Sequence, residues 1–277
     1  MLREAITVIA VAVAVTAASA AELSREAIEA ATFEDGDTLP PADQQSPLGF
    51  KLQVLLDRAR ISPGILDGYY GMNVEVALRT FAEREGLDSD GQLSAELWDR
   101  LGGNDTEALM EYEISTDNVD GPFVEAIPGG FEEMAEMDLL YYSGPDELLA
   151  EKFHMHVDVL KQLNPGADFS EAGTEIVVAA VSDDTVIRDD VGQNSGQVGS
   201  DERRPTEGKV VRVEVDKEME QVRGYDSDGK VLVAYPATIG SEATPSPSGT
   251  WEVVAVVRDP NYTCTASSGP STSDSGV

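Results

Sequence analysis

The spacing of apolar residues changes along the chain, and this change limits the folds available to it. In the first half, apolar residues recur three and four positions apart, as between Leu52 and Ala59, which is the stripe of an amphipathic helix. From Lys209 onwards they alternate with polar residues, as between Val211 and Val215, which indicates half-buried strands. The sequence therefore predicts an α+β chain made of several small domains.

The charge balance excludes two classes of partner. The chain has 52 acidic and 19 basic residues and a formal net charge of −33 at pH 7. Such a surface repels nucleic-acid phosphates and anionic lipid headgroups, so neither is expected as a partner. We interpret the acidic residues as a solvated surface rather than as a specific cation-binding site.

Residues 1–20 have the pattern of a secretory signal peptide. Arg3 precedes an apolar run from Ala5 to Ala18, and Ala18-Ser19-Ala20 offers a small-residue cleavage site. The run is short for a membrane span, although an uncleaved membrane anchor is the alternative. We expect a mature protein of the periplasm or cell envelope, without membrane contact after cleavage. The one cysteine, Cys264, leaves no intrachain disulfide to stabilise it.

A polar stretch over residues 21–45 is predicted to be a tether, and residues 46–103 are predicted to form a unit of three helices. Ser46, Asn73 and Ser94 are the expected N-caps, and Gly86 is expected to end the second helix. A turn at residues 67–71 separates the first two helices.

The motifs of this unit resemble those of the peptidoglycan-binding type 1 domain. They are Gly64-Ile65-Leu66-Asp67-Gly68-Tyr69-Tyr70-Gly71, Ala77-Leu78-Arg79-Thr80-Phe81 and Asp90-Gly91. The resemblance covers the whole unit and implies a module that holds cell-wall glycopeptide in a shallow groove. By this resemblance, Asp67, Tyr69 and Tyr70 are the candidate substrate-binding residues. The tyrosine rings would offer flat faces to a sugar or peptide, or would only cover the helix ends.

Residues 104–137 are predicted to be an acidic linker, and residues 138–182 a small unit of two helices and a strand. The segments 163–166 and 173–178 resemble the end of a degenerate LysM module, in which two helices pack on a short sheet. The turn at residues 143–146 departs from the glycine-aspartate-threonine turn of that family, which weakens the case for binding of N-acetylglucosamine polymers and leaves both outcomes open. His154 and His156 are interpreted as structural, because side chains two apart on a helix diverge. No metal and no cofactor is expected.

Residues 183–207 are predicted to be a flexible linker, and residues 208–263 are predicted to open an antiparallel β-sandwich. The four expected strands cover residues 211–215, 219–225, 230–238 and 250–258. With no second sheet against them, their apolar faces and edges are expected to be exposed.

The loop before the fourth strand closely resembles part of the L,D-transpeptidase catalytic domain. The matching segments are Tyr235-Pro236-Ala237-Thr238-Ile239-Gly240 and Thr244-Pro245-Ser246-Pro247-Ser248-Gly249-Thr250-Trp251-Glu252-Val253. The resemblance implies the cross-linking of peptidoglycan stem peptides, or the attachment of proteins to them, through a cysteine acyl-enzyme. The late serine-histidine-glycine-cysteine motif of that family does not occur in these 277 residues. We therefore assign no catalytic residue and expect the catalytic domain to stop short.

Cys264 begins a tail, residues 264–277, that does not resemble the family. No histidine or arginine adjoins it, so we interpret it as an accidental thiol rather than a nucleophile. Three hypotheses remain: an L,D-transpeptidase by descent, a non-catalytic peptidoglycan-binding envelope protein, and an envelope structural protein without a ligand. Peptidoglycan is the expected partner, with an envelope protein as a further one.

Overall fold

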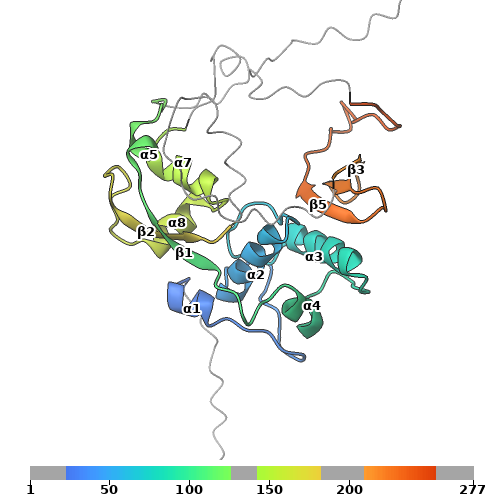
Figure 1. Cartoon of the computed structure of the whole chain (residues 1–277), viewed down its shortest axis with the longest axis horizontal. Coiled ribbons are helices and arrows are strands. Elements are labelled where there is room, and N and C mark those ends of the chain that lie inside the picture. The colour runs from blue at the N-terminus through green and yellow to red at the C-terminus, as the bar shows by residue number, and fades with distance from the viewer. Residues whose placement is uncertain (1–22, 126–141, 182–208, 254–277) are drawn as a thin grey trace, which may run out of the picture.

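The computed structural model describes residues 23–125, 142–181 and 209–253, which form seven helices and two small antiparallel sheets (Figure 1). The described part of the chain is therefore a mixed α+β protein, as the change in apolar spacing predicts. The predicted signal peptide, the predicted linker at 183–207 and the tail with Cys264 lie outside the described residues. Among the helices that the structure describes, none has the length and hydropathy of a membrane span.

The three predicted helices are α2 (Pro47–Arg58), α3 (Met72–Glu85) and α4 (Ala95–Arg100). The Ser46 and Ser94 side chains accept hydrogen bonds from the backbone of the first turns of α2 and α4, as expected of N-caps. Gly86 ends α3 in the left-handed conformation, also as expected. The predicted cap Asn73 is wrong, because α3 has already begun before it and its N-cap is Gly71.

The described residues of the predicted tether, 23–45, are instead part of the fold. They contain α1 (Arg25–Glu29), and the side chains of Leu23, Ile28 and Phe33 are buried. The Nζ atom of Lys51 donates to the carbonyl oxygens of Glu29 and Ala31, both at 3.0 Å, which satisfies the end of α1. Burial lowers the pKa of Lys51 below its usual value. The segment is polar on average, and the tether prediction therefore overlooked the few apolar residues that anchor it in the cores.

The predicted acidic linker is folded over its first half. It contains β1 (Leu109–Glu113) and α5 (Thr116–Asp120), and β1 pairs antiparallel with β2 (Glu175–Ala179). The Glu29 carboxylate accepts from the backbone N–H groups of Ala108 and Leu109, so α1 is joined to the start of β1. Residues 126–137 of this predicted linker lie outside the described residues.

The second unit places α7 (Pro145–Lys152) and α8 (Val157–Leu163) against this two-stranded sheet. Asn164, which is buried, ends α8 and joins it to β2. Its Nδ2 donates to the Val177 carbonyl at 2.7 Å, and its Oδ1 accepts from the Val177 N–H at 2.6 Å. The asparagine of the LysM-like motif is therefore a structural link between the last helix and the last strand.

The last sheet has the order β3-β4-β5, formed by β3 (Arg212–Asp216), β4 (Gln221–Tyr225) and β5 (Val231–Pro236). These correspond to the first three predicted strands: β3 is shifted by one residue from the prediction, and β4 and β5 are shorter than predicted. Residues 250–253 of the predicted fourth strand are not in a strand, and its remainder lies outside the described residues. The prediction that the valine side of this first strand is buried is wrong, because the sheet packs by its other face. Val211, Val213 and Val215 are exposed, which agrees with the expectation that the apolar face has no second sheet against it.

This sheet is docked on α3 and on the chain that follows α2 (Figure 1). The Thr80 hydroxyl on α3 donates to the Gln221 Oε1 atom at 2.8 Å, and both side chains are buried. Ser62 donates its backbone N–H to the Ala234 carbonyl at 2.8 Å, and Ala234 donates to the Arg60 carbonyl at 2.9 Å. Residues 60–62 therefore pair with the outer side of β5.

Two hydrophobic cores hold these elements together, and α2 contributes to both. The first core consists of Leu23, Ile28, Phe50, Val54, Leu66, Ala108, Leu109, Ile114, Leu149, Ala150, Phe153, Met155, Val159, Leu160, Ile176, Val178 and Ala179. The second core consists of Phe33, Leu52, Leu55, Leu56, Ile61, Tyr70, Val74, Ala77, Leu78, Phe81, Ala82, Leu93, Leu97, Trp98, Tyr225, Val231 and Ala234. Neither core is confined to one of the predicted domains.

Candidate functional site

The turn between α2 and α3, residues 62–71, is held by one buried amide. Gln53 on α2 is 2% exposed, and its Oε1 accepts from the backbone N–H groups of Asp67 at 3.0 Å and Gly68 at 2.7 Å. Its Nε2 donates to the Asp67 Oδ1 at 2.8 Å and to the Tyr69 carbonyl at 3.1 Å. All four hydrogen-bonding positions of the amide are used, so the turn is fixed before any ligand arrives.

Asp67, the first predicted binding residue, faces its own turn. Its Oδ1 accepts from Gln53 and also from the backbone N–H of Tyr69 at 3.0 Å. Its carbonyl accepts from the Gln45 side chain at 2.9 Å. The structure therefore gives Asp67 the role of positioning Tyr69.

The turn also lies very close to the start of α2. Gly68 has φ +83°, and its carbonyl accepts from the Ser46 N–H at 2.9 Å. A Cβ atom on Gly49 would lie 2.4 Å from that same carbonyl oxygen, which is closer than van der Waals contact allows. Gly49 is therefore required for the approach, and Gly68 for the backbone conformation.

The two predicted tyrosines have different environments. Tyr69 is 38% exposed, whereas Tyr70 is 4% exposed and belongs to the second core. The Tyr70 hydroxyl donates to the Gly91 carbonyl and accepts from the Leu93 N–H, both at 3.2 Å. Burial raises the pKa of Tyr70 to about 12. The expectation that Tyr70 offers its ring to a ligand is wrong, because the ring packs inside the protein.

Two further apolar side chains are exposed beside Tyr69 in the sequence. Ile65 is 51% exposed and Met72 is 78% exposed, and we call Ile65, Tyr69 and Met72 the apolar loop. Sequence reasoning did not single out Ile65 or Met72 as site residues. Where exposed apolar side chains form a contiguous patch, they mark a site of interaction.

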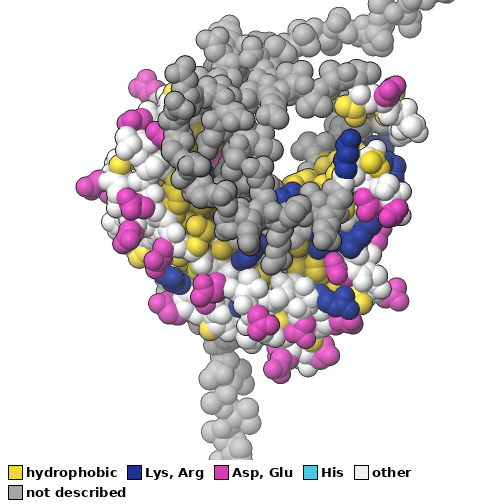
Figure 2. Space-filling model, in the orientation of Figure 1, with side chains coloured by type: hydrophobic (Ala, Val, Ile, Leu, Met, Phe, Trp, Pro, Cys, Tyr) yellow, Lys and Arg dark blue, Asp and Glu magenta, His cyan; other side chains and the backbone are white. Residues whose placement is uncertain are grey.

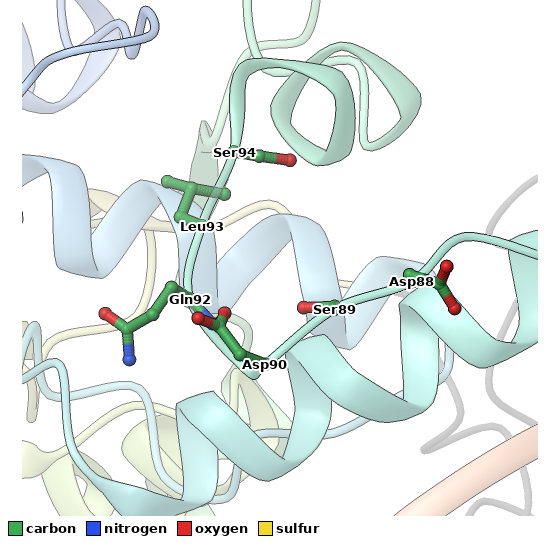
Figure 3. Close-up of a pocket in the computed structure, with 6 residues that line it drawn as sticks. All are labelled: Asp88, Ser89, Asp90, Gln92, Leu93 and Ser94. Atoms are coloured by element: carbon green, nitrogen blue, oxygen red, sulfur yellow. The ribbon is translucent and has the colours of Figure 1, made fainter.

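A shallow hollow of about 520 Å³ lies on the neighbouring loop between α3 and α4. Its lining residues follow one another along that loop, as Figure 3 shows: Asp88, Ser89, Asp90, Gln92, Leu93 and Ser94. The Asp90 Oδ1 accepts from the Gln92 N–H at 2.9 Å, which helps to hold the loop. Tyr70 connects this loop to the apolar loop through Gly91 and Leu93. The hollow is open, and the carboxylate and hydroxyl oxygens of its lining are hydrogen-bond acceptors, while Leu93 adds an apolar side chain.

The two histidines have separate partners. The His154 Nδ1 lies 3.0 Å from the Asp57 Oδ2, which joins the turn after α7 to α2. The His156 Nδ1 accepts from the Asp158 N–H at 3.3 Å and caps α8. Across residues 23–125, 142–181 and 209–253, no three histidine, cysteine, aspartate or glutamate side chains gather as a metal site would require.

The proline-rich loop at residues 244–250 is organised by Lys217. The Lys217 Nζ donates to the Ser246 carbonyl at 3.2 Å and to the Ser248 Oγ at 2.6 Å. The Gly240 N–H donates to the Ser246 Oγ at 2.9 Å. Trp251, which follows the loop, is 74% exposed. These contacts fix the shape of the loop, and they bring no thiol or imidazole to it among the described residues.

Acidic side chains are spread over the visible described surface, and basic ones are fewer (Figure 2). No family model matches the chain, and no curated protein matches it.

Proposed function

We propose that the protein is an exported cell-envelope protein of the L,D-transpeptidase type that binds peptidoglycan through the apolar loop. The observation that carries this proposal is the turn fixed by Gln53, which exposes Tyr69 between Ile65 and Met72. The resemblance of residues 46–103 to the peptidoglycan-binding type 1 domain points to the same turn.

The chemistry of the turn suits a glycopeptide. Sugar rings have flat C–H faces that pack on an aromatic ring, while the tyrosine hydroxyl remains available for hydrogen bonding. The neighbouring hollow adds the carboxylate and hydroxyl oxygens of its lining as hydrogen-bond acceptors. Because the turn is already ordered, binding does not carry the entropy cost of fixing a flexible loop.

Export and partner follow from the same proposal. The signal-like residues 1–20 would bring the protein to the periplasm, where peptidoglycan is its main partner and an envelope protein a further one. The LysM-like packing of α7 and α8 on the β1-β2 sheet supports a cell-wall assignment. Cross-linking of stem peptides is the activity of the family that the proline-rich loop resembles, and we assign no residue of this chain to it.

Retention on purified sacculi tests the proposal, with two tyrosines as a matched pair. Tyr69 and Tyr235 are 38% and 39% exposed, so Tyr69→Ala and Tyr235→Ala remove the same group from equally exposed sites. We expect Tyr69→Ala to weaken retention about tenfold, which corresponds to the loss of one good aromatic contact. Tyr235→Ala should bind as the unchanged protein does.

Two results would overturn the proposal. One is an unchanged protein that is not retained on sacculi, which would leave the envelope structural protein as the better hypothesis. The other is equal retention of the two tyrosine variants, which would place wall binding away from the apolar loop.

A further inference from the structure

Strand β3 is an edge strand. Among the described strands it has one neighbour, β4, whereas β4 lies between β3 and β5. Its other edge therefore carries backbone N–H and C=O groups without a strand partner in the described part of the chain. Figure 1 shows that β5 is the strand of this sheet that lies against α3, so β3 is on the side away from the helices. Such an edge is a template for pairing with another strand.

One face of the sheet at this edge is apolar. Val211, Val213 and Val215 are 60%, 57% and 54% exposed. Gly224 of β4 lies opposite Val213, and Val222 lies opposite Val215, so the apolar face continues onto the second strand. Proline residues and charged side chains commonly block an exposed edge strand. β3 contains no proline, and its valine face carries no charged side chain.

The charges of β3 are self-complementary. Arg212 and Glu214 alternate with the valines and point to the other face of the sheet. If two copies of β3 pair antiparallel about Val213, Arg212 of each lies opposite Glu214 of the other. A pairing centred on Glu214 or Arg212 would instead place two like charges opposite one another, which is unfavourable. One register therefore satisfies both charges and keeps all the valines on one face.

Arg212 is already held beside this edge. Its guanidinium carbon lies 3.7 Å from the centre of the Tyr225 ring, and Arg212 also forms an ion pair with Glu214 in the same chain. Pairing with a second copy would exchange the two intrachain ion pairs, one in each copy, for two between the copies. Tyr225 is the residue opposite Arg212 on β4, so its ring fixes the arginine on the charged face of the sheet.

We propose that β3 is a docking edge for β3 of a second copy of this chain, and that the pairing joins the two three-stranded sheets into one. The interface is isologous, because the same strand serves both copies. The net charge of −33 on each copy opposes the encounter. That repulsion acts over a distance that falls from about 30 Å at 0.01 M salt to about 8 Å at 0.15 M. The dimer is therefore expected to be stronger at higher salt.

Charge reversal at the edge gives a sharp test in the full chain. In a homodimer, Arg212→Glu places two carboxylates opposite one another, and Glu214→Arg places two guanidinium groups opposite one another. We expect each variant alone to raise the dimer dissociation constant tenfold or more, on the order of one lost charge contact. An equimolar mixture of the two variants restores attraction between the copies, so it should form a heterodimer. Sedimentation velocity and native mass spectrometry measure these states.

Arg25→Glu is the matched control. Arg25 forms an exposed ion pair with Glu111 on the other sheet, and its reversal changes the net charge by the same amount as Arg212→Glu. This control should dimerise like the unchanged protein, and circular dichroism verifies that every variant is folded.

An unchanged protein that stays monomeric at high concentration and salt would overturn the proposal. A dimer that both charge reversals leave intact would overturn it as well, because stacking of the valine faces would then be the contact. A mixture that remains monomeric while the unchanged protein dimerises would exclude the register centred on Val213.

Discussion

Gln53 has a role that its place in the sequence conceals. It lies between Leu52 and Val54, which belong to different cores, so α2 is buried on two sides. A polar side chain there must find partners inside the protein, because an unpaired buried amide is costly. The partners are fourteen to sixteen positions away in the chain. Helical spacing alone therefore could not identify this residue.

Replacing Gln53 by leucine should destabilise the protein by about 3 kcal/mol, because several buried backbone and carboxylate groups lose their partner at once. Urea unfolding followed by circular dichroism measures this change. The variant should also lose sacculus binding, since Tyr69 is no longer held. Gln92→Leu is the control for the stability measurement alone, because Gln92 is exposed and its side chain forms one long hydrogen bond of 3.5 Å to Glu75. Equal stability of the two variants would contradict the role given to Gln53.

Tyr69 and Tyr70 show what the sequence could and could not predict at the site. The turn and its surrounding helices were predicted from caps and apolar spacing, because those signals are local. Which tyrosine is exposed depends on the Gly91 and Leu93 backbone groups, more than twenty positions away. Adjacent side chains in an irregular turn have no fixed period, so nothing local separates the two rings.

At the scale of elements, the long helices were predictable, whereas α1 and β1 were not. α2 and α3 have 12 and 14 residues, which is enough for three turns of apolar spacing. α1 and β1 have five residues each and depend on distant partners. The Glu29 carboxylate joins them, and Ala179 of β2 pairs with Leu109 of β1. Such partners leave no periodic signal in the sequence.

The Asp146–Lys161 ion pair joins the first turn of α7 to the last turn of α8, with a separation of 2.7 Å. Burial opposes ionisation of Asp146, but the hydrogen bond and charge of Lys161 outweigh it and lower the pKa of Asp146. The hydrogen bond and charge of Asp146 raise the pKa of Lys161. The stabilisation by Asp146 is present above its ordinary pKa of 3.8 and is lost as the pH falls through the lowered value. The stabilisation by Lys161 is present below its ordinary pKa of 10.5 and is lost as the pH rises through the raised pKa.

Asp146→Asn should therefore lower the free energy of unfolding by about 0.5 kcal/mol at neutral pH, since both side chains are partly exposed. The difference from the unchanged protein should vanish in acid, below the lowered pKa of Asp146. Urea unfolding across this pH range measures it, and a double-mutant cycle with Lys161→Gln isolates the pair. Glu151→Gln, an exposed carboxylate on the same helix, serves as the control. A pH-independent difference would show that the ion pair is not its source.

At the scale of the whole molecule, the domain boundaries predicted from composition do not coincide with boundaries between the hydrophobic cores. The predicted tether contributes Ile28 to the first core and Phe33 to the second. The last sheet contributes Tyr225 to the second core. Backbone hydrogen bonds also cross between units, because Leu66 donates to the His154 carbonyl at 2.8 Å and accepts from the His156 N–H at 3.0 Å. Polar composition between two elements measures solvent exposure, and it does not show that the elements are independent.

One cooperative unfolding transition is therefore expected for both cores. Leu149 is fully buried in the first core, and Trp98 is fully buried in the second. Trp98 fluorescence therefore reports on the second core, whereas a substitution of Leu149 perturbs the first. Leu149→Ala should cost about 3 kcal/mol through the lost contacts and the cavity that remains. In a Trp251→Phe background, which removes the exposed tryptophan, we expect the urea midpoint of Trp98 fluorescence to fall together with that of circular dichroism.

The control for this experiment is Met110→Ala, which removes a side chain that is 39% exposed on β1 and should change stability by less than about 0.5 kcal/mol. If the units fold independently, Leu149→Ala will leave the Trp98 transition in place while the helical signal of the second unit melts earlier. That result would contradict cooperative unfolding through α2. Coincident midpoints would instead mean that the two cores unfold together, so that Leu149→Ala in the first core destabilises the surroundings of Trp98 in the second. Helix α2 would couple them, because it contributes Phe50 to the first core and Leu52 to the second.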